Sequence, residues 1–354
     1  MSLGTGPGSS PVAPTAAPPT IIIQQQRETP GFFSRLRNWL LYSILMISLL
    51  FNMQMLGQHE TYLSSADSPT EKYHSGDKDT KDRIAIINVT GTIMPPLTAR
   101  VKKDIKKARE DKLVKAVVLQ VNSPGGLVSD SHEIYHELQK LAKEKPIVCS
   151  MQGLAASGGL YIAMGVGKSG KIIAEPTTWT GSIGVIIPRY EAAGLAEKVG
   201  IKATPLKTGP YKDALSPFRP MTEDEEKVWR NILNQAFEKF LEVIDENRDT
   251  LKMDQVKALA TGEIYTAKDA LAKGLIDAIG FEEDALEAAK KSAGLEKARV
   301  VTYTHAVGLL EIFGGSSQSR APDTEGYLRA FLDAAVPRAM YYFSWAPALP
   351  GTTP

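Results

Sequence analysis

Hydrophobic and polar positions alternate in blocks across residues 84–285, and the blocks predict strands followed by helices. Runs of β-branched and apolar residues predict strands at 84–93, 116–126, 145–151 and 171–176. Helical spacing of apolar residues follows at 99–111 and 129–143, and two shorter helical stretches come later at 254–262 and 266–277. Strands alternating with helices of this length indicate βαβ units, so we predict an α/β fold with a parallel sheet covered on both faces.

One longer helix is predicted over residues 221–248. Thr222 and Glu225 form a capping-box pattern at its start. A single apolar stripe then recurs at helical spacing, made of Val228, Ile232, Phe237, Leu241 and Ile244. The pattern predicts an amphipathic helix that packs along this stripe.

The N-terminal part has a different character. Residues 1–37 are rich in small and polar residues and are expected to be disordered. From Trp39 to Leu56 no residue is charged, so we predict a transmembrane anchor at 38–57. A polar, aperiodic linker is expected at 58–82.

Charges around the anchor predict its orientation. Arg27, Arg35 and Arg37 precede it, whereas Glu60 and Asp67 follow it. The positive-inside rule keeps the N-terminus in the cytoplasm and sends the C-terminal bulk across the cell membrane. A cleaved signal peptide is the competing interpretation, and the long N-terminal extension without a clear cleavage site disfavours it.

Overall composition excludes some function classes. Lys and Arg number 41 against 40 Asp and Glu, so no global field points to nucleic acid. Cys149 is the one cysteine, which rules out a disulfide within the chain. It lies in an apolar run, where a buried core thiol is expected.

Two glycine-containing loops after predicted strands carry candidate chemistry. NSPGG at 122–126 offers backbone N–H groups that a ligand can approach closely. AASGG at 155–159 puts Ser157 at the start of a helix, where the dipole favours a developing anion. A nucleophilic serine needs a base, and none of the five histidines stands in a context that supports a triad.

A lysine can replace histidine as the base if an apolar, water-poor site keeps its amine neutral. The best candidate is Lys212 in the loop TGPYKDALSPFRP, flanked by Tyr211, Ala214 and Leu215. A carboxylate at Asp213 that faced the Lys212 amine would favour the charged form of the lysine. The Asp213 carboxylate is therefore expected to point elsewhere.

Four motifs in this order carry a family resemblance: NSPGG, QGLAASGGLYIA, TGSIGV at 180–185 and TGPYKDALSPFRPMTEDE. Together they resemble the signal peptide peptidase A (protease IV) family of Ser-Lys serine peptidases over residues 84–285. The resemblance implies a ClpP/crotonase-type fold of stacked βαβ units at 83–295 and a C-terminal extension at 296–354. It implies Ser157 as nucleophile, Lys212 as general base, Ser182 as the residue that orients the lysine, and Gly125 and Gly158 as oxyanion donors.

The same resemblance implies partners. Substrates would be cleaved signal peptides and other apolar membrane-associated peptides, and short family members form homo-oligomeric rings with shared active sites. No cofactor and no metal are implied. Two rival hypotheses are a non-catalytic, membrane-bound scaffold ring of the same fold and a crotonase-type acyl-CoA enzyme, which would need a CoA site.

The segment HEIYH at 132–136 fits the helical zinc-peptidase pattern H-E-x-x-H. On a helix, however, His132 and His136 share a face with lysines, and no third ligand stands out. We therefore expect HEIYH on the exposed side of its helix. The aromatic-rich tail at 326–350 leaves three options open: packing on its own domain, the membrane surface or a neighbouring subunit.

Overall fold

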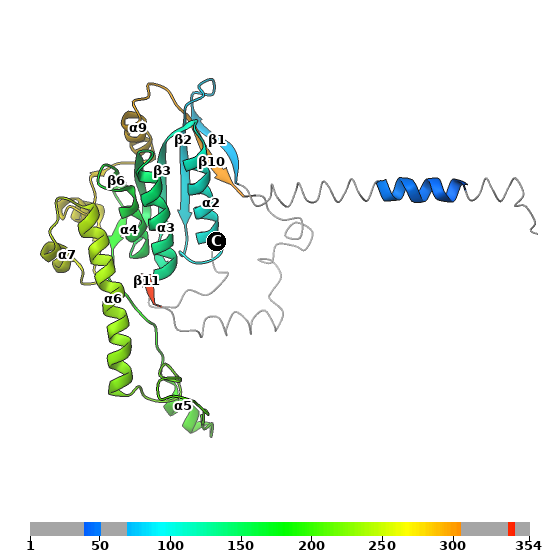
Figure 1. Cartoon of the computed structure of the whole chain (residues 1–354). Helices are drawn as coiled ribbons and strands as arrows, with labels where there is room; N and C mark the ends of the chain where they lie inside the picture. The colour runs from blue at the N-terminus through cyan, green and yellow to red at the C-terminus, as the bar shows by residue number, and fades with distance from the viewer. Residues whose placement is uncertain (1–38, 51–68, 306–338, 344–354) are drawn as a thin grey trace, which may run out of the picture. The chain divides into compact units, whose positions relative to one another are not determined.

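A computed structural model describes residues 39–50, 69–305 and 339–343 (Figure 1). Residues 39–50 are helical and form part of a unit separate from the rest. The remainder of the expected anchor and residues 58–68 of the expected linker lie outside the described residues. Among the helices that the structure describes, none is both long enough and apolar enough to cross a bilayer.

The larger unit alternates strands and helices. Its elements are β1 (Thr70–Gly76), β2 (Arg83–Thr90), α2 (Leu97–Glu110), β3 (Val114–Ser123), β4 (Gly125–Leu127), α3 (Val128–Ala142), β5 (Ile147–Ala156), α4 (Gly158–Ala163), η1 (Met164–Val166), β6 (Lys171–Ala174), β7 (Trp179–Gly181), α5 (Ala193–Lys198), α6 (Glu223–Asn247), α7 (Met253–Leu259), β8 (Ile264–Thr266), α8 (Ala267–Ala272), β9 (Ala278–Ile279), α9 (Glu282–Ser292), β10 (Arg299–Thr304) and β11 (Met340–Tyr342).

The main sheet has the strand order β1-β10-β2-β3-β5-β6-β9, and every pair from β10 to β9 is parallel. Alternate residues of the central strands point to opposite faces. Ala85, Ile87 and Leu119 pack in the larger core with α2, α3 and α6, whereas Ile84 and Val118 pack with α9. Both faces are therefore covered, which confirms the α/β prediction.

β5 pairs with two different strands along its length. Its first part, Val148–Met151, pairs with β6, and its end, Leu154–Ala156, pairs with β7. β7 continues the pairing to β8 in the antiparallel sense. The sheet therefore divides at the end of β5, immediately before Ser157.

The structure differs from the sequence-based boundaries at both ends of the domain. Residues 70–76 were expected to be linker, but they form β1, which pairs antiparallel with β10. β10 and β11 fall within the expected C-terminal extension, and both pair with strands of the domain. β1 escaped prediction because its side chains are exposed or half-buried and mostly polar, as suits a sheet edge.

The predicted capping box at Thr222 is confirmed, with both of its hydrogen bonds present. The predicted stripe of α6 is only half packed. Leu241 and Ile244 in the second half are buried and Phe237 is half-buried, whereas Val228 and Ile232 in the first half are 42% and 40% exposed. The first half of α6 therefore presents apolar side chains to solvent.

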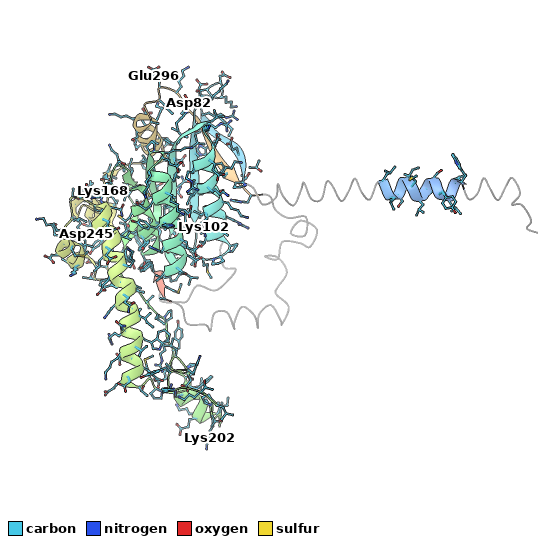
Figure 2. All side chains as sticks on the ribbon, viewed as in Figure 1. Asp82, Lys102, Lys168, Lys202, Asp245 and Glu296 are labelled. Atoms are coloured by element: carbon cyan, nitrogen blue, oxygen red, sulfur yellow. The ribbon has the colours of Figure 1, made fainter. Side chains whose placement is uncertain are left out.

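We call residues 186–222, the greater part of the segment between β7 and α6, the arm. It contains α5, which lies near the N-terminal end of α6 and away from the sheet in Figure 1. Lys202, labelled in Figure 2, lies at the outer end of the arm. Large apolar side chains are exposed along this segment, namely Ile186, Tyr190, Leu195, Val199, Ile201, Leu206, Tyr211 and Phe218.

Candidate active site

Ser157 lies at a sharp turn between β5 and α4. Its backbone has φ 52° and ψ −112°, a positive φ that non-glycine residues rarely adopt. The surrounding backbone fixes this geometry: the Ser157 N–H donates to the Gly181 carbonyl at 2.8 Å, and the Tyr161 N–H donates to the Ser157 carbonyl at 2.9 Å. Strain held by its surroundings is typical of functional positions.

Ser182 occupies an equivalent position after the neighbouring strand. Ala156 pairs with Gly181 at the ends of β5 and β7, and each is followed by a serine with positive φ. The Ser182 N–H donates to the Glu263 carbonyl at 2.7 Å. Parallel pairing at this register therefore brings Ser157 and Ser182 next to each other, as the resemblance requires.

The Ser157 hydroxyl is shielded from solvent. The residue is 1% exposed, and among the described residues its Oγ has no hydrogen-bond partner. An unpartnered buried hydroxyl is costly in a protein interior and is more often found where function needs it.

The glycine loop at 124–126 packs closely against Gly158, the residue after Ser157. Gly125 has φ +99°, and a Cβ there would meet the Tyr341 carbonyl oxygen at 2.0 Å and the Gly158 nitrogen at 2.6 Å. Only glycine, which has no Cβ, leaves room for these backbone atoms at position 125. As the first residue of α4, Gly158 has an N–H without an intrahelical partner, and the amide lies beside the glycine loop.

The Gly125 amide, which the resemblance implies as an oxyanion donor, has a hydrogen-bond partner within the loop. The Gly125 N–H already donates to Ser123 Oγ at 3.0 Å. The Gly125 carbonyl and the Leu127 N–H both bond to Ile93, on the opposite edge of β4. Because groups alternate between the two edges of a strand, the Gly126 N–H is the one that faces away from Ile93.

The structure does not place Lys212 beside Ser157. Lys212 lies on the arm, exposed, in a turn where its N–H donates to the Gly209 carbonyl at 3.3 Å. In the described part of this chain, the site contains the two serines and the glycine amides without the predicted base.

Asp213 points away from Lys212, as the sequence required. Arg219 donates to its carboxylate from Nη2 at 2.7 Å and from Nε at 3.0 Å, and Lys207 donates from Nζ at 2.7 Å. These bonds, with Arg219 first, hold the pKa of Asp213 well below its usual range. Arg219 Nη1 also donates to Glu225 at 2.9 Å, so the Lys212 turn is attached to the start of α6.

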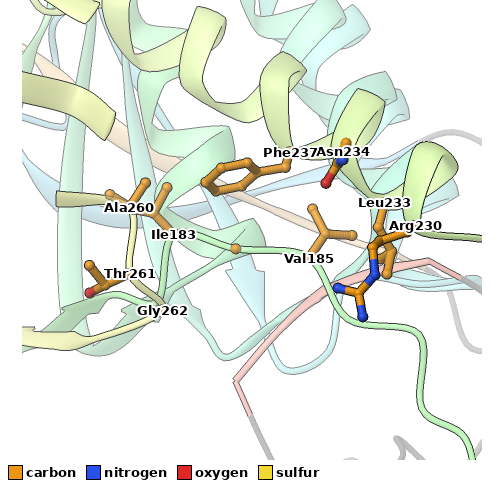
Figure 3. Close-up of a pocket in the computed structure, with 10 residues that line it drawn as sticks. Ile183, Val185, Arg230, Leu233, Asn234, Phe237, Ala260, Thr261 and Gly262 are labelled. Atoms are coloured by element: carbon orange, nitrogen blue, oxygen red, sulfur yellow. The ribbon is translucent and has the colours of Figure 1, made fainter. Parts of the chain in front are cut away.

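An open pocket of about 340 Å³ is lined in part by the residues that directly follow Ser182 (Figure 3). Ile183, Val185 and Phe237 form apolar walls, and Arg230 lies at one side. Motifs in the sequence did not reveal this pocket because its walls come from three distant segments.

The HEIYH prediction is only partly correct. His136 is exposed, but His132 is half-buried and its Nδ1 lies 2.7 Å from the hydroxyl of Tyr161. Burial lowers the pKa of His132. Within the described residues no group of three or more His, Cys, Asp or Glu side chains could hold a metal. Cys149 is fully buried, as predicted, and burial raises the pKa of its thiol.

The fold and this site together indicate a class of enzyme. A strained, buried serine at the turn from a strand into a short helix, next to a closely packed glycine loop, is typical of serine-type acyl-transfer enzymes. A model described as peptidase family S49 matches residues 139–296.

Curated relatives agree with this match. The chain is 43% identical over 200 residues to "Putative signal peptide peptidase SppA" of Enterococcus faecium, covering 56% of this chain and 57% of that protein. It is 39% identical over 221 residues to "Putative protease slr0021" of Synechocystis sp., covering 62% of this chain and 78% of that protein. It is also 33% identical over 247 residues to "Serine protease SPPA, chloroplastic" of Arabidopsis thaliana, covering 66% of this chain and 36% of that protein. The chain belongs to peptidase family S49.

Proposed function

We propose that this chain is a serine peptidase in which Ser157 is the nucleophile and Lys212 the general base. The observation that supports the proposal is the pairing of β5 with β7, because the strained, buried Ser157 and the strained Ser182 directly follow the paired residues Ala156 and Gly181. Family membership supports peptide hydrolysis as the chemistry.

In the proposed mechanism, neutral Lys212 accepts the Ser157 proton as Oγ attacks a peptide carbonyl carbon. The N–H groups of Gly126 and Gly158 stabilise the oxyanion. The lysine then returns the proton to the leaving amine, and water hydrolyses the acyl-enzyme by the same steps in reverse order.

Because Lys212 lies on the exposed arm, we propose that a neighbouring copy supplies it. The arm carries exposed apolar side chains, among them Leu195 and Val199 at 65% and 62%, that a second copy would bury. A homo-oligomeric ring in which each site combines Ser157 and Ser182 of one copy with Lys212 of the next accounts for both features.

Substrates and location follow from the same proposal. We propose apolar peptides, including cleaved signal peptides, because relatives carry signal peptide peptidase names. The uncharged run from Trp39 to Leu56 supports an anchor that holds the catalytic domain on the extracytoplasmic side of the membrane. A non-catalytic scaffold is the remaining alternative.

The test compares peptidase activity of Ser157→Ala and Lys212→Ala with that of Lys202→Ala. Each of the first two variants is expected to lose about 10³-fold or more in kcat/KM. Lys202 lies on the same arm and is exposed, so its variant controls for surface charge and is expected to retain activity. Full activity in either dyad variant would disprove the assignment.

A further inference from the structure

Two serines in the described part of the chain have a fully shielded hydroxyl without a hydrogen-bond partner, Ser131 and Ser157. Ser157 is the candidate nucleophile, whereas Ser131 has no role in the site as described so far. Ser131 is 0% exposed. A buried hydroxyl without a partner lowers the stability of a fold, so its presence at Ser131 calls for a functional explanation.

Ser131 lies in the first turn of α3, and α3 begins directly after β4. Leu127 ends the strand and Val128 begins the helix, with no residue between them. Side chains of an α-helix lean toward its N-terminal end, so the Ser131 side chain leans toward the glycine loop at 124–126. The strand that carries the Gly126 amide therefore also fixes the start of the helix that carries Ser131.

Ser131 Oγ borders the space beside Gly158, the residue after the nucleophile. A Cβ placed on Gly158 would lie 2.7 Å from Ser131 Oγ and 3.1 Å from the Gly126 nitrogen. In the first turn of a helix, the N–H bond and the Cα–Cβ direction both lean toward the N-terminal end. This space therefore lies on the side to which the Gly158 N–H points, and Ser131 Oγ and the Gly126 nitrogen both border it.

The Ser131 hydroxyl is not used by its own helix. A serine inside a helix commonly donates to the carbonyl four residues earlier, which for Ser131 is that of Leu127. Among the described residues Ser131 Oγ has no such partner, and burial keeps it from bulk solvent. Its proton is therefore available to an acceptor that enters the space beside Gly158.

We propose that the Ser131 hydroxyl is a third hydrogen-bond donor of the oxyanion hole. This rests on the proposed function, in which Ser157 Oγ bonds to the peptide carbonyl carbon and the C=O π electrons move to the oxygen. The Ser131 O–H donates to that oxygen together with the N–H groups of Gly126 and Gly158. Because the negative charge develops only during the attack, the hydroxyl stabilises the transition state more than the bound substrate.

The kinetic test uses the full-length protein and a fluorogenic apolar peptide. Ser131→Ala is expected to lower kcat about 10²-fold with little change in KM, as the loss of an oxyanion donor does. Ser131→Cys keeps nearly the same size but is a weak donor, so a similar loss is expected. Ser150→Ala is the matched control and is expected to retain kcat, because Ser150 is buried in β5 on the α9 side of the sheet, as Val148 is. Unchanged kcat in both Ser131 variants would overturn the proposal.

A tetrahedral adduct separates a donor to the oxyanion from a residue that only shapes the binding site. Ser157 adds to a peptide aldehyde and forms a hemiacetal whose oxygen takes the oxyanion position, whereas the corresponding peptide alcohol binds without a bond to Ser157. We expect Ser131→Ala to raise the inhibition constant of the aldehyde about tenfold or more and that of the alcohol by less than about twofold. Equal changes in the two constants would contradict the proposal.

Thermal unfolding needs no activity, so it separates a failure of this inference from a failure of the proposed function. Removal of an unpartnered hydroxyl is expected to leave the Tm of Ser131→Ala equal to or above that of the wild type. A clearly lower Tm would show that the Ser131 hydroxyl has a partner within the fold and would overturn the proposal. A folded wild-type chain without peptidase activity would contradict the proposed function instead.

Discussion

Two serines with positive φ, Ser157 and Ser182, form the centre of the site. The glycine-containing loop after a predicted strand made Ser157 a candidate, and the family resemblance implied a role for Ser182. They could not predict the strain, which depends on hydrogen bonds to Gly181 and Glu263 from other segments. For the same reason the motif could not show which way each amide of the glycine loop faces, since this depends on the contact of β4 with Ile93.

Ser182→Ala tests the role proposed for the second serine. A hydroxyl that donates to a neutral amine favours the neutral base, so its loss is expected to lower kcat about 10- to 100-fold. The rising limb of the pH–rate profile should move to higher pH. Ser129→Ala, at an exposed position, is the control. An unchanged pH profile in Ser182→Ala would argue against an effect on the base.

Because His132 is half-buried, we predict that the protein loses stability at acid pH. Burial lowers its pKa, so protonation favours the unfolded chain. Its contribution is therefore complete above the unfolded pKa of about 6.5 and is lost as pH falls below that value. Urea unfolding at pH 8 and pH 5 should show a smaller loss in His132→Asn than in the wild type. The exposed His136→Asn should behave as the wild type does.

At the scale of elements, the central strands and helices were predictable because burial imposes clear periodicity on them. β1 and β11 were not. β1 is a half-exposed edge strand, and β11 has three residues, too few for any pattern. Within the arm, the segment TGPYKDALSPFRP was recognised as a loop, but its attachment through Arg219 to Asp213 and Glu225 requires the folded geometry.

Arg219→Ala tests whether this attachment positions Lys212. Loss of the bonds to Asp213 and Glu225 should free the turn and lower kcat about tenfold or more, with little change in Tm because the arm adds little to the core. Lys227→Ala, which removes an exposed ion pair with Asp224 on the same helix, should leave kcat unchanged. Equal effects of the two variants would show that Arg219 has no positioning role.

At the scale of the whole molecule, the separation of Lys212 from Ser157 predicts complementation between copies. Inactive Ser157→Ala and Lys212→Ala chains, unfolded and refolded together in equal amounts, would form rings with some intact sites. Random mixing restores about a quarter of wild-type activity if each site takes serine and lysine from different copies. A mixture as inactive as its components would favour a site within one copy.

The central claim is that Ser157 is an activated nucleophile. The most direct measurement is labelling with a fluorophosphonate followed by mass spectrometry of the digested full-length protein. We expect one adduct, on Ser157, absent in Ser157→Ala and formed far more slowly in Lys212→Ala. An adduct on another residue, or no adduct in the folded protein, would contradict the account.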